Sequence, residues 1–211
     1  MPADQTSIRL PAHPARYLRA TLPLLVALAS LLSACGGGGG DSAPAGPTGP
    51  STGSGVGTMQ LPAGTDTSCG LAGFREEALR LINERRAAGA SCGSAGSFAP
   101  TGAVAWSDPL TQAAYGHSKD MADRNYFDHT SFDGRVLSDR ISATGYAWSS
   151  IGENIAAGYP SVAAVVNGWM SSPGHCRNIM NAAFREIGLA CARNDSSQYE
   201  LYYTLDLATP R

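Results

Sequence analysis

The chain has 211 residues, of which 43% are hydrophobic and 15% are charged, and its formal net charge is −2. This charge and the absence of a basic stripe argue against a nucleic-acid surface, so no nucleic-acid partner is expected. Once the N-terminal segments are set aside, the remaining length suits one folded domain with a single core.

Residues 1–34 have the pattern of a secretory signal peptide. Three arginines make its start positive, and an apolar run over residues 22–32 is too short to span a bilayer as a stable helix. Residues 32–35, Leu-Ser-Ala-Cys, resemble a bacterial lipobox, in which the cysteine becomes the lipidated first residue after cleavage. Cys35 is therefore the expected lipidation site. The alternative is an ordinary signal peptide with a chance cysteine.

Residues 35–66 are expected to form a flexible tether between this lipid and the domain. Five glycines follow Cys35, and a Gly/Pro/Ser/Thr-rich stretch continues to about Gly57. Such a segment buries nothing and acts as a spacer. The glycine directly after Cys35 resembles lipoproteins forwarded to an outer membrane, so the expected location is the outer membrane of the cell envelope. The folded domain is expected over residues 67–211.

The four remaining cysteines are an even number in an exported domain, which predicts two disulfides. We expect Cys69–Cys92 and Cys176–Cys191, because each bond would join neighbouring segments across a short loop. A metal site built from cysteines is the alternative, but the sequence contains no C-x-x-C pair.

Hydrophobic periodicity predicts four helices followed by a hairpin. The first helix covers residues 71–88, with Arg85 and Arg86 on its solvent face, and the second starts at Asp108-Pro109. The third carries apolar spacing from Val136 to Ile141 and is ended by Gly145, and the fourth runs from residue 162 until Ser172-Pro173-Gly174 breaks it. A period of two over residues 187–191 and 201–205 then predicts an antiparallel hairpin. Helices followed by a hairpin indicate an α+β fold with helices packed on a small sheet.

Three short segments place ionisable side chains beside turn-forming or small residues. They are Phe127-Asp128-His129-Thr130-Ser131, Gly152-Glu153-Asn154-Ile155 and Ser172-Pro173-Gly174-His175. We expect each to lie in a loop over a pocket. Two imidazoles and a carboxylate are a common minimum for binding a divalent metal or moving a proton, which makes these segments the candidate site.

Five pieces of the chain, in order, resemble the CAP superfamily of cysteine-rich secretory, antigen 5 and pathogenesis-related class 1 proteins. The pieces include residues 110–122, Phe127-Asp128-His129, Gly152-Glu153-Asn154-Ile155-Ala156, Trp169 with Ser172-Pro173-Gly174-His175 and residues 177–180, and Glu186-Ile187-Gly188. The chain is similar to the short bacterial branch, the SCP-like extracellular proteins. The resemblance implies a three-layer α-β-α sandwich with a small antiparallel sheet and a surface cleft.

In that cleft the family sets two histidines and two acidic residues, and some members hold zinc or another divalent cation there. His129 and His175 match the histidines and would be the metal ligands, and Glu153 matches the first acid. Asn154 and His117 would complete the cleft. The position of the second acid reads Met170-Ser171-Ser172, so the fourth member is missing, and a metal held by two imidazoles should be weak and lost below about pH 6.5.

Each of these residues also has a structural interpretation. A loop histidine such as His129 is often a surface residue, and a buried Glu153 could accept backbone hydrogen bonds and pin its loop. His117 lies on the apolar face of its helix, which favours a satisfied core histidine over a wall of the cleft. Cys176 has a disulfide partner, and Ser172 lacks the glycine elbow of a serine hydrolase.

Three functions are consistent with this sequence. The first is a non-catalytic binding module, anchored in the membrane, whose cleft takes a small or lipidic ligand with or without Zn²⁺ or another divalent cation. The second is a metal-dependent hydrolase acting on peptide or cell-wall material, with Glu153 as general base. The third is an envelope scaffold or adhesin that works through surface contacts.

Overall fold

The computed structural model describes residues 4–9 and 60–211. In chain order its elements are β1 (Asp4–Arg9), α1 (Phe74–Ala88), β2 (Ala90–Ser91), a 3₁₀ turn (Gly93–Ala95), β3 (Ser97–Phe98), β4 (Ala105–Trp106), α2 (Asp108–Arg124), α3 (Leu137–Ala143), β5 (Trp148–Ala157), α4 (Val162–Met170), α5 (Pro173–Met180), β6 (Glu186–Arg193) and β7 (Leu201–Pro210). No helix in these described ranges is both long and apolar enough to cross a membrane.

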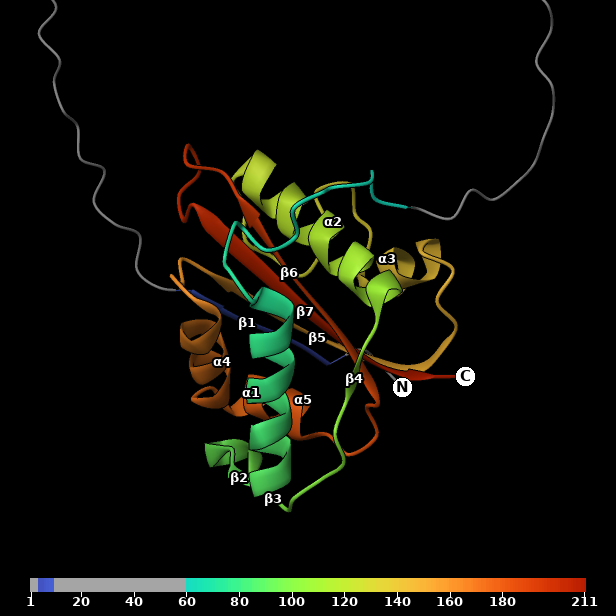
Figure 1. Ribbon diagram of the computed structural model, residues 1–211, viewed down its shortest axis with the longest axis vertical. Helices are drawn as coiled ribbons and strands as arrows, with labels where there is room; N and C mark the ends of the chain where they lie inside the picture. Colours follow the sequence, from blue (N-terminus) through green and yellow to red (C-terminus); the bar gives the residue numbers. More distant parts are fainter. Residues whose placement is uncertain (1–3, 10–59) are drawn as a thin grey trace, which may run out of the picture. The chain divides into compact units, whose positions relative to one another are not determined.

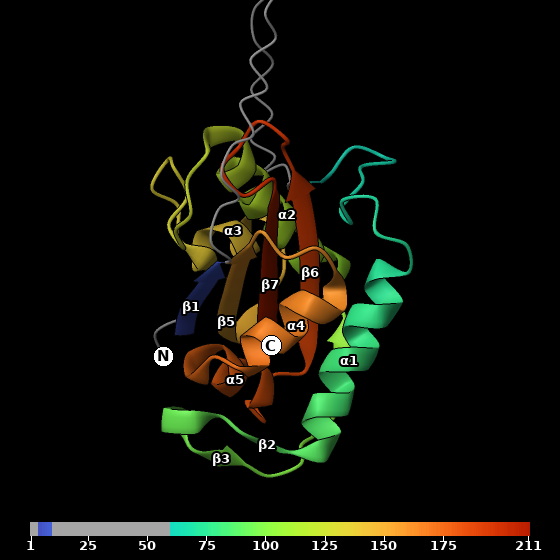
Figure 2. The same cartoon turned by 90° about the vertical axis from the view of Figure 1, so that its left-hand side faces the viewer.

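The structure is a three-layer α-β-α sandwich around a five-stranded sheet, as predicted. The strand order is β1-β5-β7-β6-β4, with β5, β7 and β6 antiparallel and the two outer strands added in parallel. Helices α2 and α3 cover one face of the sheet, and α1, α4 and α5 cover the other (Figure 1). Figure 2 looks onto the sheet with α4 and α5 in front. A separate two-stranded sheet joins β2 and β3.

The alternation of side chains along β7 divides the core between the two faces of the sheet. Tyr203, Leu205 and Leu207 belong to a cluster with the apolar sides of α1, α4 and α5, whereas Tyr202 and Ala208 belong to clusters with α2 and α3. This is the period of two that predicted the hairpin. Gly188 on β6 permits close packing, because a Cβ there would lie 2.2 Å from the backbone nitrogen of Thr111 on α2.

The two expected disulfides are present, but their predicted pairing was wrong. Cys69 is bonded to Cys191 and Cys92 to Cys176, each with a Cα–Cα distance of 5.4 Å. Cys69 and Cys92 lie beyond opposite ends of α1, and a helix of 15 residues is about 22 Å long. A short loop cannot bring them together, whereas the docking of the helices on the sheet does bring the observed pairs together.

Arg86 was predicted on the solvent face of the first helix, and this was wrong. Its side chain is fully buried. Its guanidinium donates hydrogen bonds to the backbone carbonyls of Gly102, Ile179, Asn181 and Phe184. It therefore ties α1 to the loops that precede α2 and follow α5, with its donors satisfied by backbone oxygens.

Strand β1 falls inside the segment expected to be a signal peptide. Residues 4–9 pair in parallel with β5 and belong to the same compact unit as residues 60–211. Six residues of the expected leader are therefore paired with the sheet in the unprocessed chain. The cleavage before Cys35 stays a prediction, and Cys35 and most of the tether lie outside the described residues.

Candidate functional site

The centre of the candidate site is β5, which carries Glu153 and Asn154 in its middle. The sequence was expected to form a loop here, and the structure shows a strand instead. Both faces of β5 are buried from Ile151 to Ala157, so the strand lacks the alternation of apolar and polar residues that marks a half-buried strand. Because neighbouring side chains point to opposite faces, Glu153 is directed towards α2 and α3, and Asn154 towards α5.

Glu153 accepts a charged hydrogen bond at each carboxylate oxygen. Oε1 lies 2.6 Å from Nδ1 of His129, and Oε2 lies 2.5 Å from a guanidinium nitrogen of Arg140. The side chains of Glu153 and Arg140 are 0% and 2% exposed. Arg140 also donates to the carbonyls of His129 and Arg135, so it fixes the loop that carries His129.

The electrostatics of this cluster keep Glu153 ionised. Burial raises the pKa of its carboxyl, but the hydrogen bond from His129 and the charge of Arg140 outweigh that effect and lower the pKa to about 2. Since an ionised carboxylate is only an acceptor, Nδ1 of His129 must carry the proton that it shares with Glu153. The other ring nitrogen, Nε2, is buried and has no hydrogen-bond partner among the described residues.

His117 is a fully buried histidine of α2 that lies behind this cluster. Its Nε2 lies 2.9 Å from the carbonyl oxygen of Asp128, to which it donates, and its Nδ1 lies 3.3 Å from the hydroxyl of Ser131. Burial, the largest influence, lowers the pKa of His117 to about 4 against the opposing charge of Glu153. The residue is therefore neutral and satisfied at pH 7, as the structural interpretation proposed.

His175 lies on the other face of the sheet. It was expected in a loop after a helix break, but Pro173 begins a new helix, α5, and His175 is in its first turn and fully buried. Proline ends one helix and is also favoured at the first position of the next. The amide of Asn154 donates to the carbonyl of His175 (3.2 Å), and Asn178 donates to Asn154 Oδ1 (2.9 Å). These bonds connect β5 to α5.

Sequence reasoning missed two residues of the cluster, Arg140 and Asp206. Asp206 on β7 is the cross-strand partner of Glu153, and its carboxyl is fully buried. Burial, followed by the charge of Glu153, raises the pKa of Asp206 well above its usual value, which favours the neutral form of this acid. No hydrogen bond of acceptable geometry joins its carboxyl oxygens to a described residue. Arg140 had a sequence signal, namely a charge at an apolar position of the predicted third helix, whereas Asp206 lies just beyond the predicted strand of residues 201–205.

The donor set does not fit a metal centre built by the described residues alone. His129 has the orientation of many metal-bound histidines, with one nitrogen on a carboxylate and the other directed away from it. However, both oxygens of Glu153 are engaged by cationic or protonated groups, and residues 4–9 and 60–211 contain no group of three or more His, Cys, Asp or Glu placed for a metal.

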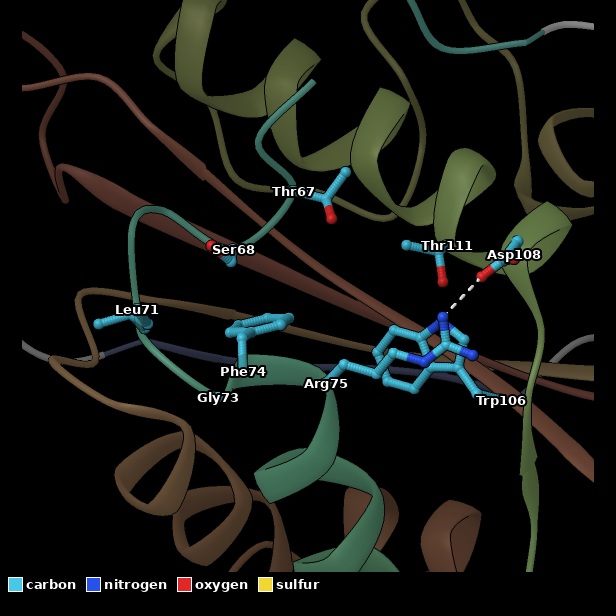
Figure 3. A pocket seen from close by; sticks show the side chains of 9 residues that line it. All are labelled: Thr67, Ser68, Leu71, Gly73, Phe74, Arg75, Trp106, Asp108 and Thr111. Atoms are coloured by element: carbon cyan, nitrogen blue, oxygen red, sulfur yellow. Dashed lines mark hydrogen bonds and ion pairs between the residues drawn. The ribbon is translucent and has the colours of Figure 1, made fainter. Parts of the chain in front are cut away.

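A separate cavity of about 340 Å³ lies between the starts of α1 and α2 (Figure 3). Arg75 crosses it, with its guanidinium 5.1 Å from the ring centre of Trp106 and 3.2 Å from the carboxylate of Asp108. None of the predicted site residues lines this cavity. Its charged side chains are already paired with each other, so nothing here specifies a ligand.

Known proteins resemble this chain in both sequence and fold. It is 35% identical over 99 residues to the uncharacterized membrane protein YlbC of Bacillus subtilis (strain 168). This match covers 47% of this chain and 27% of YlbC. It is 38% identical over 89 residues to the uncharacterized protein YkwD of the same organism. This match covers 42% of this chain and 35% of YkwD. The matches thus span about a third or less of these relatives.

A solved structure of an extracellular protein containing an SCP domain, from Bacillus anthracis str. Ames, has a TM-score of 0.52 and 30% identity, over 64% of this chain and 39% of that chain. The sandwich is thus that of an SCP-type domain. The chain belongs to the cysteine-rich secretory protein (CAP) family, which it matches over residues 79–207. Extracellular SCP-domain relatives agree with an exported protein.

Proposed function

We propose that this protein is an exported, membrane-tethered CAP domain that binds a ligand and does not catalyse a reaction on it. The ligand binds along the edge of β5, a strand that contacts His129 on one face of the sheet and His175 on the other. The state of Glu153 supports this proposal most strongly. Both of its oxygens are engaged and its pKa is lowered to about 2. A carboxylate of this kind is a poor general base at neutral pH, because proton transfer is most efficient with a base whose pKa lies near the working pH.

A hydrolase remains the second candidate, and one observation favours it. Glu153 orients His129 as the acid of a catalytic triad orients its histidine, and Nε2 of His129, although buried, has no hydrogen-bond partner among the described residues. In this alternative the base is His129, and Glu153 only positions it. Cys176 is not the missing nucleophile, since it forms a disulfide with Cys92.

Turnover and binding can be measured on the same protein to decide between these functions. Fluorescein-labelled casein and purified peptidoglycan sacculi should release no soluble fragments above the buffer level. The fatty-acid probe cis-parinaric acid and Zn²⁺ test lipidic and imidazole-binding ligands, and binding of at least one should weaken roughly tenfold in His129→Ala. Release of fragments that is lost in His129→Ala would overturn the binding proposal. Binding unchanged by both His129→Ala and His175→Ala would favour the scaffold.

The proposed anchor is tested by the substitution Cys35→Ser. Without a thiol to lipidate, the exported protein should move from the membrane fraction to the soluble fraction of the cell envelope, because lipid attachment is the proposed source of its membrane affinity. Fractionation followed by immunoblotting measures this, with Cys35-containing protein as the control. A variant that stays with the membrane would contradict the lipid anchor.

A further inference from the structure

Strand β1 forms the outer edge of the sheet alongside the candidate site. Its six residues pair in parallel with β5, from Asp4 opposite Gly152 to Arg9 opposite Ala157. Gln5 and Thr6 are thereby the strand neighbours of Glu153 and Asn154. Figure 2 shows β1 beside β5, with α5 close by on the near face of the sheet. Residues 4–9 therefore run directly past the two central residues of the site.

In the absence of β1, β5 would be the edge strand. The strand order places β7 on its other side and, among the described residues, no strand beyond β1. The backbone N–H and C=O groups that β5 turns outward would then lack strand partners, and such an edge is a template for another extended chain. Signal-peptide cleavage before Cys35 would produce this state, because residues 4–9 would leave with the leader.

Two side chains of β1, Ile8 and Arg9, lie on opposite faces of the sheet. Ile8 is partly buried and packs against the core cluster on the side of α1, α4 and α5. The guanidinium of Arg9 lies 6.0 Å from the ring centre of Tyr199, which belongs to the cluster on the α2 side. Main-chain pairing with alternate side chains on the two faces is the usual mode by which a peptide adds to a sheet.

We propose that the edge of β5 is the docking site for an extended peptide, which adds to the sheet in parallel, and that residues 4–9 occupy this site in the unprocessed chain. This inference rests on the proposed function and names the ligand class of the same site. A peptide satisfies the repeated backbone groups of β5, which a lipid chain leaves without partners. Removal of the leader opens the site, so the unprocessed chain is closed by its own N-terminus.

The test compares the processed chain without its lipidated residue, residues 36–211, with residues 1–211 carrying Cys35→Ser. Both disulfides and all the described fully buried apolar side chains lie between residues 69 and 208, so the shorter protein retains the described core. The probe is a fluorescent peptide with the sequence of residues 3–10, ADQTSIRL. We expect saturable binding to residues 36–211, measured by anisotropy, and binding at least roughly tenfold weaker to residues 1–211.

Modified peptides test the geometry without changing the protein. N-methylation at every second residue should abolish binding for one alternating set and leave it nearly unchanged for the other, because alternate residues of a parallel edge strand bond to the sheet. Ile8→Asp in the peptide should weaken binding roughly tenfold or more, since Ile8 packs on the core. The reversed sequence LRISTQDA is the composition control and should bind at least as weakly.

Failure of the inference and failure of the proposed function give different results. No binding of the peptide, or equal binding to both proteins or of the reversed sequence, overturns peptide docking. If cis-parinaric acid or Zn²⁺ still binds in a manner that depends on His129, only the ligand class proposed here is wrong. If no probe binds, both proposals fail. Both proposals are supported if the peptide binds residues 36–211 but binds residues 1–211 more weakly, and if N-methylation of only one alternating set of residues abolishes binding.

Discussion

Replacing Glu153 by glutamine is expected to lower the free energy of unfolding by about 3–5 kcal/mol. The reason is that Arg140 is almost fully buried and would lose the carboxylate that neutralises it, while His129 would lose its ionised acceptor. Removing one member of a buried ion pair leaves the other charge without compensation. Urea unfolding at pH 7, followed by circular dichroism, measures the loss.

Two further variants separate a lost charge from a general effect of mutation. Glu153→Gln combined with Arg140→Met removes both charges and should recover at least half of the loss. Glu84→Gln breaks an exposed pair with Arg80 and should change the unfolding free energy by only about 0.5 kcal/mol or less. If Glu153→Gln cost less than about 1 kcal/mol, the account of the buried pair would be wrong. A large cost also means that loss of activity in Glu153→Gln does not identify a base.

The second large effect is a pH dependence caused by His117. Its pKa is about 4 in the folded protein, against 6.5 for an unperturbed histidine. The unfolded chain therefore gains a proton below pH 6.5 that the folded chain does not bind, so this contribution to stability is present above pH 6.5 and is lost as the pH falls to 4. The shift corresponds to about 3 kcal/mol between pH 7 and pH 4.

His117→Gln is the matched variant, because an amide can donate to Asp128 and accept from Ser131 without titrating. The difference in unfolding free energy between wild type and variant should change by about 3 kcal/mol between pH 7 and pH 4, in favour of the variant at low pH. Taking this difference removes the opposite contribution of Asp206, whose raised pKa stabilises the fold as the pH falls. A constant difference from pH 7 to pH 4 would contradict the burial of a neutral His117.

Periodicity predicted the second helix and the C-terminal hairpin, although both strands of that hairpin are buried on both faces of the sheet. The helix at Asp108 and the β6–β7 hairpin lie where the patterns placed them. Strand β5 was missed because its polar residues are buried and satisfied by other layers. Helix α5 was missed because Pro173 was interpreted only as the end of α4. The disulfide partners were mispaired since they meet only after the helices dock on the sheet.

The candidate site was predictable as a set of segments but not as a set of contacts. His129 and Glu153 were chosen from different segments, and the structure joins them directly. His175 reaches the same strand only through Asn154 and from the opposite face. Arg140, which together with His129 keeps Glu153 ionised, was not recognised as a site residue because an arginine on a short helix is usually exposed to solvent.

The bond between Cys69 and Cys191 determines how the domain responds to mechanical force. A pull on the chain N-terminal to Cys69 passes through the disulfide into β6, which is bonded on one side to β7 along its whole length. Helix α1 follows Cys69 in sequence and is thereby shielded from the load. Tension applied there would extend only the segment before Cys69, until the bond is broken or β6 is sheared from the sheet. Reduction of this disulfide would redirect the same force into α1.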